Sequence, residues 1–297
     1  SSSEKAVDGE INESEEGIII LDQTPFYAES GGQVGDTGQI KCHESIFEVQ
    51  DTQKKGDHYL HLGFMKSGKL TLKDEVSAEI DSKERKRIKS NHSGTHLLHA
   101  ALREVLGEHV EQKGSLVDQS KLRFDFTHSK SIETEEITKI ENLINEQILL
   151  NSETITEILP IEEAIERGAI AFFGDKYGDE VRVLNIGDNF SVELCGGTHV
   201  SMTGEIELLK ITSESSVSAG IRRIEAVTGE AANHLLDHLE HIYCSISNEL
   251  LIDDFDTREG IEALEYIRFL ENEMSVFAKL LNCSQDQVLT KIIQMKE

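Results

Sequence analysis

The segment His92-Ser93-Gly94-Thr95-His96 lies in the middle of the clearest helical pattern in the sequence. Around it, apolar residues and histidines recur at spacings of three and four from Ile88 to Val105, and Gly107 ends the pattern. This period predicts an amphipathic helix of about five to six turns. Two histidines one turn apart lie on the same face of a helix, so both imidazoles can reach one point in space.

A second segment whose side chains could bind a metal, Cys195-Gly196-Gly197-Thr198-His199, follows between two expected strands. Its two glycines let the backbone turn tightly enough for the cysteine and the histidine to converge. Three imidazoles and one thiolate form a ligand set suited to tetrahedral Zn²⁺. We therefore predict a zinc site made of His92, His96, Cys195 and His199. The spacing leaves open whether the metal is structural, with four closed positions, or catalytic, with an exchangeable one.

The residue after the first histidine argues against one class of zinc enzyme. A zinc protease with the HExxH motif needs a glutamate there as general base, and this sequence has Ser93.

Either segment alone would be weak support for a metal, because a lone pair of histidines on an apolar helix face is often just part of a core. The two segments together favour metal binding.

Around these segments the sequence predicts an α+β protein with three parts. Residues 1–82 contain short alternating runs separated by glycines, which favours a small barrel-like β subdomain with a Gly-rich binding loop over 24–38. Residues 83–229 combine helices with mainly antiparallel strands, which we interpret as an α/β sandwich that carries the zinc. Residues 230–297 have helical spacing throughout, so we expect a coiled-coil-like helical hairpin that packs against other domains or a second copy.

The composition limits the classes of protein to consider. With 38% hydrophobic residues among 297, the chain has too much apolar material to be disordered, and no apolar run reaches the ~20 residues that span a bilayer. The first residues carry no secretion signal, and the 4 cysteines form no CxxC pair, so we expect a soluble cytoplasmic protein with reduced thiols. A formal net charge of -27 argues against a general nucleic-acid coat. An RNA partner would need a local basic patch.

Six stretches of the sequence, in this order, carry a family resemblance. They are TPFYAESGGQVGDTG (24–38), NHSGTHLL (91–98), VEQKGSL (110–116), LRFD (122–125), CGGTHV (195–200) and RRIEAVTG (222–229). They resemble the editing domain of alanyl-tRNA synthetase. The same zinc-site pattern occurs in the free-standing AlaX trans-editing proteins and, more distantly, in the editing domain of threonyl-tRNA synthetase.

This resemblance implies hydrolysis of the ester that joins a wrong amino acid, serine or glycine, to the 3' end of tRNA(Ala). It implies that Gln112 and Thr37 lie in the catalytic pocket, and Thr37 is our candidate partner for the serine hydroxyl. A site that hydrogen-bonds this hydroxyl can reject alanine, whereas a small apolar pocket cannot strongly reject serine. Two mechanisms stay open. Zinc polarises the attacking water, or it anchors the α-amino group while Gln112 and a ribose hydroxyl position the water.

Further residues are assigned from the same motifs. Asn91, Arg123 and Asp125 are expected beside the substrate, where they either touch it or shape the pocket. A basic run directly before the zinc helix, together with the last motif, is expected to contact tRNA phosphates. The candidates for these contacts are Arg85, Lys86, Arg87 and Arg222.

We expect the chain to be the editing portion of a synthetase, without the aminoacylation domain. A free-standing trans-editing deacylase, a non-catalytic zinc-stabilised tRNA-binding module and a general zinc hydrolase of small esters are the alternatives. One departure from the family pattern is Glu207, at a position where glycine is common. A carboxylate there puts the strand pairing around it in doubt.

Overall fold

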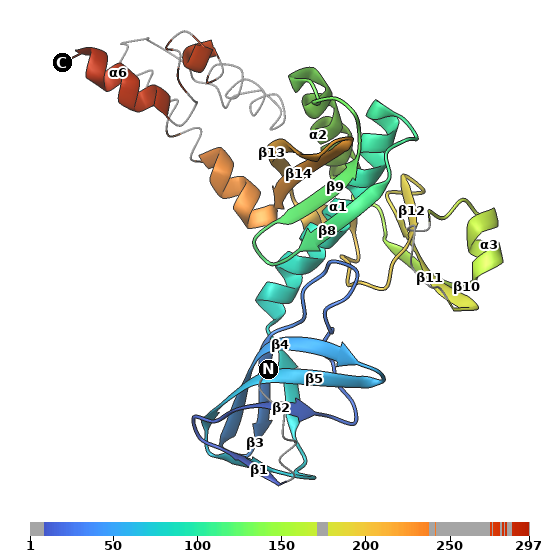
Figure 1. Cartoon of the computed structure of the whole chain (residues 1–297), viewed down its shortest axis with the longest axis vertical. Coiled ribbons are helices and arrows are strands. Elements are labelled where there is room, and N and C mark those ends of the chain that lie inside the picture. The colour runs from blue at the N-terminus through green and yellow to red at the C-terminus, as the bar shows by residue number, and fades with distance from the viewer. Residues whose placement is uncertain are drawn as a thin grey trace. The chain divides into compact units, whose positions relative to one another are not determined.

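The computed structural model describes residues 9–170, 178–237, 241, 274, 276–279, 281, 283 and 287–296. The chain divides into two compact units, residues 1–229 and 230–297. Their described residues form a mixed α/β structure with several sheets (Figure 1). The boundary that we predict between residues 82 and 83 falls inside the first unit and stays a prediction.

The first sheet has five antiparallel strands in the order β2-β5-β4-β3-β7. Two short strands, β1 and β6, pair with each other beside it. Within residues 9–80 the edge strands β2 and β7 do not pair with each other, so the sheet is open and the expected barrel is not formed. The bounds are β1 (Glu10–Asn12), β2 (Glu16–Ile20), β3 (Gly38–Cys42), β4 (Ser45–Lys55), β5 (His58–Ser67), β6 (Lys69–Thr71) and β7 (Ser77–Ile80).

The second sheet has four antiparallel strands in the order β13-β14-β9-β8, and two helices pack against it. Figure 1 shows the longer helix, α1, leading away from the first sheet and lying along the second. Leucine, isoleucine and phenylalanine side chains from both layers form one core. The bounds are α1 (Ser82–Leu106), β8 (Gln112–Val117), β9 (Leu122–Thr127), α2 (Thr134–Leu149), β13 (Leu209–Ser218) and β14 (Ile221–Thr228).

A third, three-stranded sheet brings the cysteine segment to α1. Its order is β10-β11-β12, and all pairs are antiparallel. The strand β12 ends at Leu194, directly before Cys195. The bounds are β10 (Ile155–Pro160), α3 (Ile161–Glu166), β11 (Glu180–Ile186) and β12 (Ser191–Leu194).

The ends of α1 follow from its sequence. The Asp81 side chain accepts hydrogen bonds from the backbone N–H groups of Lys83 and Glu84 at 2.9 and 3.0 Å, which caps the helix. Gly107 ends it with a φ of 115°, a conformation that glycine tolerates best. The helix starts at Ser82, six residues before the predicted apolar pattern at Ile88, and so includes the whole basic run, because the cap rather than the apolar period sets its beginning.

Glu207, the residue that departs from the family pattern, lies outside the strands. Residues Thr203–Ile206 form a 3-10 turn, and β13 begins only at Leu209. Glu207 has a φ of 67° and a ψ of -65°, and the Leu208 N–H donates to the Ile206 carbonyl at 2.9 Å. A non-glycine residue in such a γ-turn is strained. This conformation explains why glycine suits the position.

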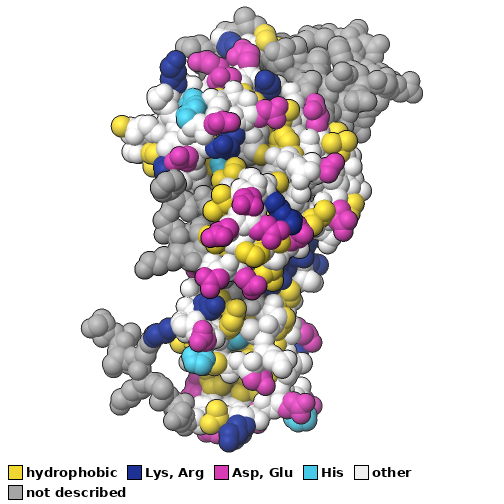
Figure 2. All heavy atoms as spheres, turned by 90° about the vertical axis from the view of Figure 1, so that its right-hand side faces the viewer, with side chains coloured by type: hydrophobic (Ala, Val, Ile, Leu, Met, Phe, Trp, Pro, Cys, Tyr) yellow, Lys and Arg dark blue, Asp and Glu magenta, His cyan; other side chains and the backbone are white. Residues whose placement is uncertain are grey.

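In the second unit the described helical segments include α6 (Val288–Lys296). The side chains of Met274, Ala278, Val288 and Ile292 are buried together. The turn at 253–256 in the predicted helical hairpin lies outside the described residues. No helix among the described residues is long and apolar enough to cross a membrane. Figure 2 shows acidic side chains spread over the described surface of one face, interspersed with basic ones.

Candidate metal centre

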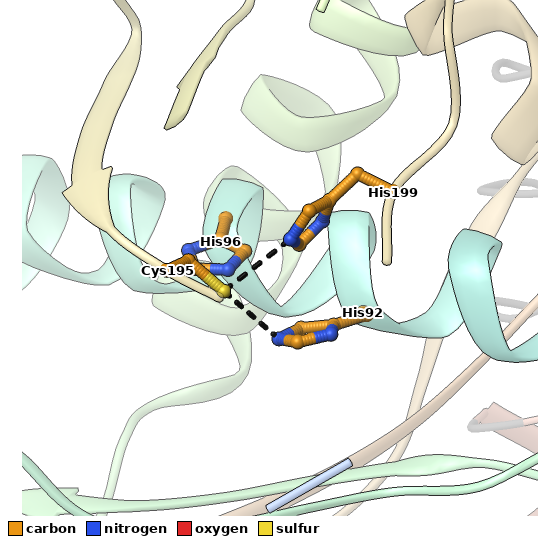
Figure 3. A group of neighbouring side chains, drawn as sticks. All are labelled: His92, His96, Cys195 and His199. Atoms are coloured by element: carbon orange, nitrogen blue, oxygen red, sulfur yellow. Dashed lines mark hydrogen bonds between the residues drawn. The ribbon is translucent and has the colours of Figure 1, made fainter. Parts of the chain in front are cut away.

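The four predicted ligands meet at one point. One potential ligand atom from each of His92, His96, Cys195 and His199 lies within 4.8 Å of the others. Figure 3 shows the thiol of Cys195 between the imidazoles of His92 and His199. The distances from Cys195 Sγ to Nε2 are 3.5 Å for His92 and 3.3 Å for His199. The structure therefore brings together the two sequence segments on which the zinc prediction rests.

Two local features allow this meeting. The helix α1 places His92 and His96 one turn apart, with their ring centroids 5.2 Å apart. The loop after β12 passes so close to the helix that a Cβ atom on Gly197 would lie 2.1 Å from Cε1 of His92. Only glycine fits at position 197, so Gly197 lets the cysteine segment approach the helix, whereas a Cβ atom on Gly196 would meet no atom within 4 Å.

Each imidazole is oriented by a hydrogen-bond partner on its other nitrogen. The Nδ1 atoms lie 2.7 Å from Gln33 Oε1 for His92, 2.7 Å from Glu193 Oε2 for His96 and 3.3 Å from Ser93 Oγ for His199. With Nδ1 occupied, each ring presents Nε2 to the centre. His96 Nε2 is buried and has no hydrogen-bond partner among the described residues.

The electrostatics of the group favour a thiolate. Burial alone would raise the pKa of Cys195, but the charges of His96 and His92, and hydrogen bonds from His199 and His92, outweigh burial and hold this pKa well below its usual value. Burial and the neighbouring His92 lower the pKa of His199 to about 3. A thiolate and a neutral imidazole are the ligand forms that bind a metal.

The buried carboxylate of Glu193 favours the protonated form of His96. Burial would lower the pKa of His96, but the Glu193 carboxylate and the Cys195 thiolate outweigh burial and raise it to about 10. In return, His96 and His99 outweigh the effect of burial on Glu193 and lower the pKa of its carboxyl group. A cation is therefore favoured at this point, whether it is the imidazolium proton or a metal ion.

These observations show that the residues fit Zn²⁺. Three imidazole nitrogens and one thiolate are a common tetrahedral zinc set, and an orphaned buried Nε2 is a donor atom in need of a partner. His92, His96, Cys195 and His199 would hold the ion. The role of these residues as ligands stays a proposal.

A cavity of about 650 Å³ opens beside the group. His92, His96 and Cys195 line it together with Gln112 at the start of β8. The Gly-rich stretch 24–38 also contributes lining residues, so the binding loop that we predict from its composition reaches this cavity. The size of the cavity is in the range of sites for small molecules.

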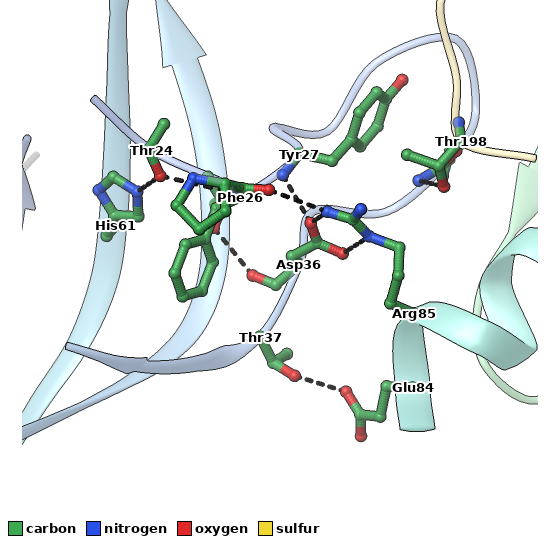
Figure 4. Close-up of polar contacts among 12 residues, drawn as sticks. Thr24, Phe26, Tyr27, Asp36, Thr37, His61, Glu84, Arg85 and Thr198 are labelled. Carbon is green, nitrogen blue, oxygen red and sulfur yellow. Dashed lines mark hydrogen bonds and ion pairs between the residues drawn. The ribbon is translucent and has the colours of Figure 1, made fainter. Parts of the chain in front are cut away.

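Of the two predicted pocket residues, the structure brings only Gln112 to the metal group. Thr37 lines a different hollow, between the first sheet and the start of α1. Its hydroxyl donates to Glu84 Oε2 at 2.6 Å, as Figure 4 shows. Thr37 therefore links the Gly-rich loop to the first turn of α1 in this structure. Its predicted contact with serine stays a prediction.

The three residues expected beside the substrate lie outside the cavity lining. Asn91 is buried, donates to the Asp118 carbonyl at 2.8 Å and accepts from the Thr228 hydroxyl at 2.7 Å. Asp125 accepts two hydrogen bonds from the Arg223 guanidinium, at 2.7 and 2.8 Å. Arg123 lies on β9, opposite Leu116 of β8. The contacts of Asn91 and Asp125 shape the second sheet and its helix.

The predicted tRNA-contact residues fall into two kinds. Arg85, which is partly buried, forms an ion pair with the buried Asp36, and its Nε donates to Asp36 Oδ1 at 2.7 Å (Figure 4). Arg222 pairs with Glu214 at 2.5 and 2.6 Å. Both guanidinium groups thus have structural contacts. The other two candidates, Lys86 and Arg87, are exposed on α1, and Lys86 pairs with Glu207 at 3.5 Å.

Comparison with known proteins shows which family the chain is similar to. Residues 2–84 match the family described as tRNA synthetases class II (A), and residues 181–225 match the threonyl and alanyl tRNA synthetase second additional domain. An alanine–tRNA ligase of Dechloromonas aromatica is 48% identical over 290 residues, which is 97% of this chain and 33% of that protein. The chain belongs to the alanyl-tRNA synthetase family. Another alanine–tRNA ligase, from Saccharophagus degradans, is 57% identical over 235 residues, 78% of this chain and 27% of that protein.

The chain thus spans about a quarter to a third of the length of these alanyl-tRNA synthetase relatives. Sequence reasoning missed the three residues that orient the imidazoles: Gln33, Glu193 and Ser93. Glu193 had a weak signal, because it lies two positions before Cys195 on a strand and so shares a face with it. Gln33 had only its place beside Gly31 and Gly32 in the Gly-rich stretch.

Proposed function

We propose that this chain is the editing portion of an alanyl-tRNA synthetase and hydrolyses the ester of tRNA(Ala) mischarged with serine or glycine. The observation that carries the proposal is that three residues of the His/Cys group, His92, His96 and Cys195, line a cavity that Gln112 also lines. A purely structural zinc site needs no such cavity. The family relationship supports tRNA as the partner.

The residues of the cavity can bind and orient the reacting groups. When bound, Zn²⁺ would supply a positive charge that polarises an ester oxygen or a water molecule, or holds the α-amino group of the substrate. The side-chain amide of Gln112 can accept a hydrogen bond from a water molecule at its oxygen and donate a hydrogen bond to the ester from its NH₂ group, so it can fix the direction of attack. The cavity walls hold the aminoacyl group near the ligands.

Selection of serine over alanine would come from hydrogen bonding. A polar group that meets the serine hydroxyl is left unpaired when alanine binds, and this costs about 1 to 3 kcal/mol. Thr37 is our proposed partner from the family resemblance. Because its hydroxyl contacts Glu84 in this structure, binding would require the loop around Thr37 to rearrange.

The test is release of labelled serine from seryl-tRNA(Ala), with alanyl-tRNA(Ala) as the comparison substrate. The proposal expects rapid serine release and little alanine release. A Cys195→Ala, His199→Ala double variant that stays folded should lose the activity, and Gln112→Ala should reduce it while a Gln53→Ala control on the first sheet should not. A folded, zinc-loaded chain that binds tRNA and releases no serine would indicate a non-catalytic binding module instead.

A further inference from the structure

We propose that Gln33 is a positioning residue for the metal centre. Its side chain orients the ligands, and through it the Gly-rich loop of the first sheet takes part in metal binding. The inference rests on the zinc site of the proposed function. The buried side chain of Gln33 hydrogen-bonds to both ligand segments at once.

The hydrogen bonds of Gln33 connect His92 to the cysteine segment. Its Oε1 accepts from His92 Nδ1 at 2.7 Å and from the Thr198 backbone N–H at 2.9 Å. Its Nε2 donates to the Thr198 hydroxyl at 2.9 Å. The Gln33 side chain is fully buried. One amide therefore holds a ligand on α1 and the residue next to the ligand His199.

The backbone of the loop is fixed where this side chain enters the site. Gly32 accepts a hydrogen bond at its carbonyl from Val117 N–H at 2.7 Å, and Val34 N–H donates to the Val117 carbonyl at 3.1 Å. These bonds add the loop to the edge of β8 as a short parallel partner. Gly32 has a φ of 86°, and a Cβ atom there would lie 2.6 Å from the Ser115 carbonyl oxygen. Glycine is required for this close approach.

The chemistry of an amide suits the position. An acceptor at Nδ1 of His92 keeps the ring hydrogen on that nitrogen, so Nε2 is left as the metal-binding atom. The amide N–H₂ meets the Thr198 hydroxyl at the same time. An apolar side chain of the same size would fill the space and give neither bond. We therefore assign Gln33 a role in ligand orientation beyond packing.

This assignment predicts that metal binding and docking of the Gly-rich loop depend on each other. If Gln33 holds the ligands, then zinc bound to His92 also favours the docked loop. The loop lines the cavity. The first sheet thus contributes to the site through a residue that lies far from every ligand in the sequence.

The experiment measures the zinc dissociation constant of the whole chain by competition with a chromophoric chelator. We compare the parent with Gln33→Met, which keeps the size and removes the acceptor, and with Gln33→Glu, which keeps an acceptor for His92. Gln53→Met is the control, because Gln53 lies on β4 of the same sheet and its side-chain amide donates to Glu29 and Asp51, which are not metal ligands. We expect a loss of about 10- to 100-fold in zinc affinity for Gln33→Met, a much smaller loss for Gln33→Glu and no change for the control.

Equal zinc affinity of folded Gln33→Met and the parent would overturn the inference and leave the proposed function standing. A parent chain that binds no zinc would overturn both. A second measurement does not depend on the folding of any variant: nitrogen NMR of the zinc-loaded parent with labelled histidine. A proton on Nδ1 of His92 and the metal on Nε2 support the inference, and a metal on Nδ1 overturns it. Serine release does not enter either readout, so failure of the deacylation assay alone contradicts only the proposed function.

Discussion

The carboxylate of Glu193 accepts a hydrogen bond from Nδ1 of His96 at 2.7 Å, and both side chains are almost completely buried. The other oxygen of the same carboxylate lies 2.9 Å from Nδ1 of His99, one helical turn from His96 on α1. One carboxylate at the end of β12 thus orients two histidines of the helix. Such carboxylate–histidine pairs orient metal ligands and raise their basicity.

Replacing Glu193 with glutamine should weaken zinc binding. The amide offers one acceptor oxygen, and its N–H₂ group would face the N–H of the second histidine. We expect zinc affinity to fall by about 10- to 100-fold, measured by chelator competition. Glu180→Gln is the control, because Glu180 is an exposed carboxylate on the rim of the same cavity. Unchanged affinity in Glu193→Gln would show that this carboxylate does not support the ligands.

Replacing Arg85 with alanine should destabilise the fold. The Asp36 carboxylate is buried, and removal of its guanidinium partner leaves an uncompensated buried charge. We expect a loss of about 3 kcal/mol in the free energy of unfolding, measured by urea denaturation. Lys83→Ala, at an exposed position in the first turn of the same helix, should change this free energy by less than about 0.5 kcal/mol. A stable Arg85 variant would contradict the structural role and return this residue to the candidates for tRNA contact.

Replacing Glu207 with glycine should stabilise the chain. The γ-turn conformation of Glu207 is strained for a residue with a side chain, and glycine adopts it without that strain. The gain is offset in part by the greater freedom of glycine in the unfolded state, so we expect about 1 kcal/mol of added stability. Glu207→Ala keeps the strain and should give no gain. A gain in both variants would mean that the carboxylate charge, and not the backbone, causes the cost.

The first sheet should lose stability as the pH falls below about 6.5, the usual pKa of histidine. His61 is buried, which lowers its pKa, while its bond to the Ile19 carbonyl partly opposes the shift. The neutral ring accepts a hydrogen bond from the Thr24 hydroxyl at 2.7 Å (Figure 4). Because the folded pKa is depressed, the stabilisation is fully present above the unfolded pKa and is lost as the pH falls. A His61→Gln variant should have a flatter stability profile between pH 7 and 5 in denaturation experiments. Parallel profiles would exclude His61 as the cause.

The sequence predicts best those features that depend on local spacing. His92 and His96 meet because residues four apart share a helix face, and Gly197 allows the cysteine segment to approach them. The path of the Gly-rich loop was not predictable in this way. It depends on pairing with β8, and this pairing brings Gln33 to the metal centre while Thr37 lies beside Glu84.

Strand periodicity predicts the strands of the first sheet but cannot show whether the sheet closes into a barrel, because closure depends on which edge strands pair. The turn at Glu207 was not predictable for a local reason, since a positive φ cannot be read from apolar alternation. The role of the basic run, which forms the first turns of α1, could not be predicted from the sequence either. The sequence shows the charge of Arg85, but only the fold shows that Asp36 neutralises it.

The most direct test of the central claim follows serine release while zinc is returned in steps to chelator-treated chain. We predict that the rate of serine release from seryl-tRNA(Ala) rises in proportion to bound zinc and reaches its maximum at about one ion per chain. Full zinc occupancy without serine release, or release that does not change with zinc, would contradict the account.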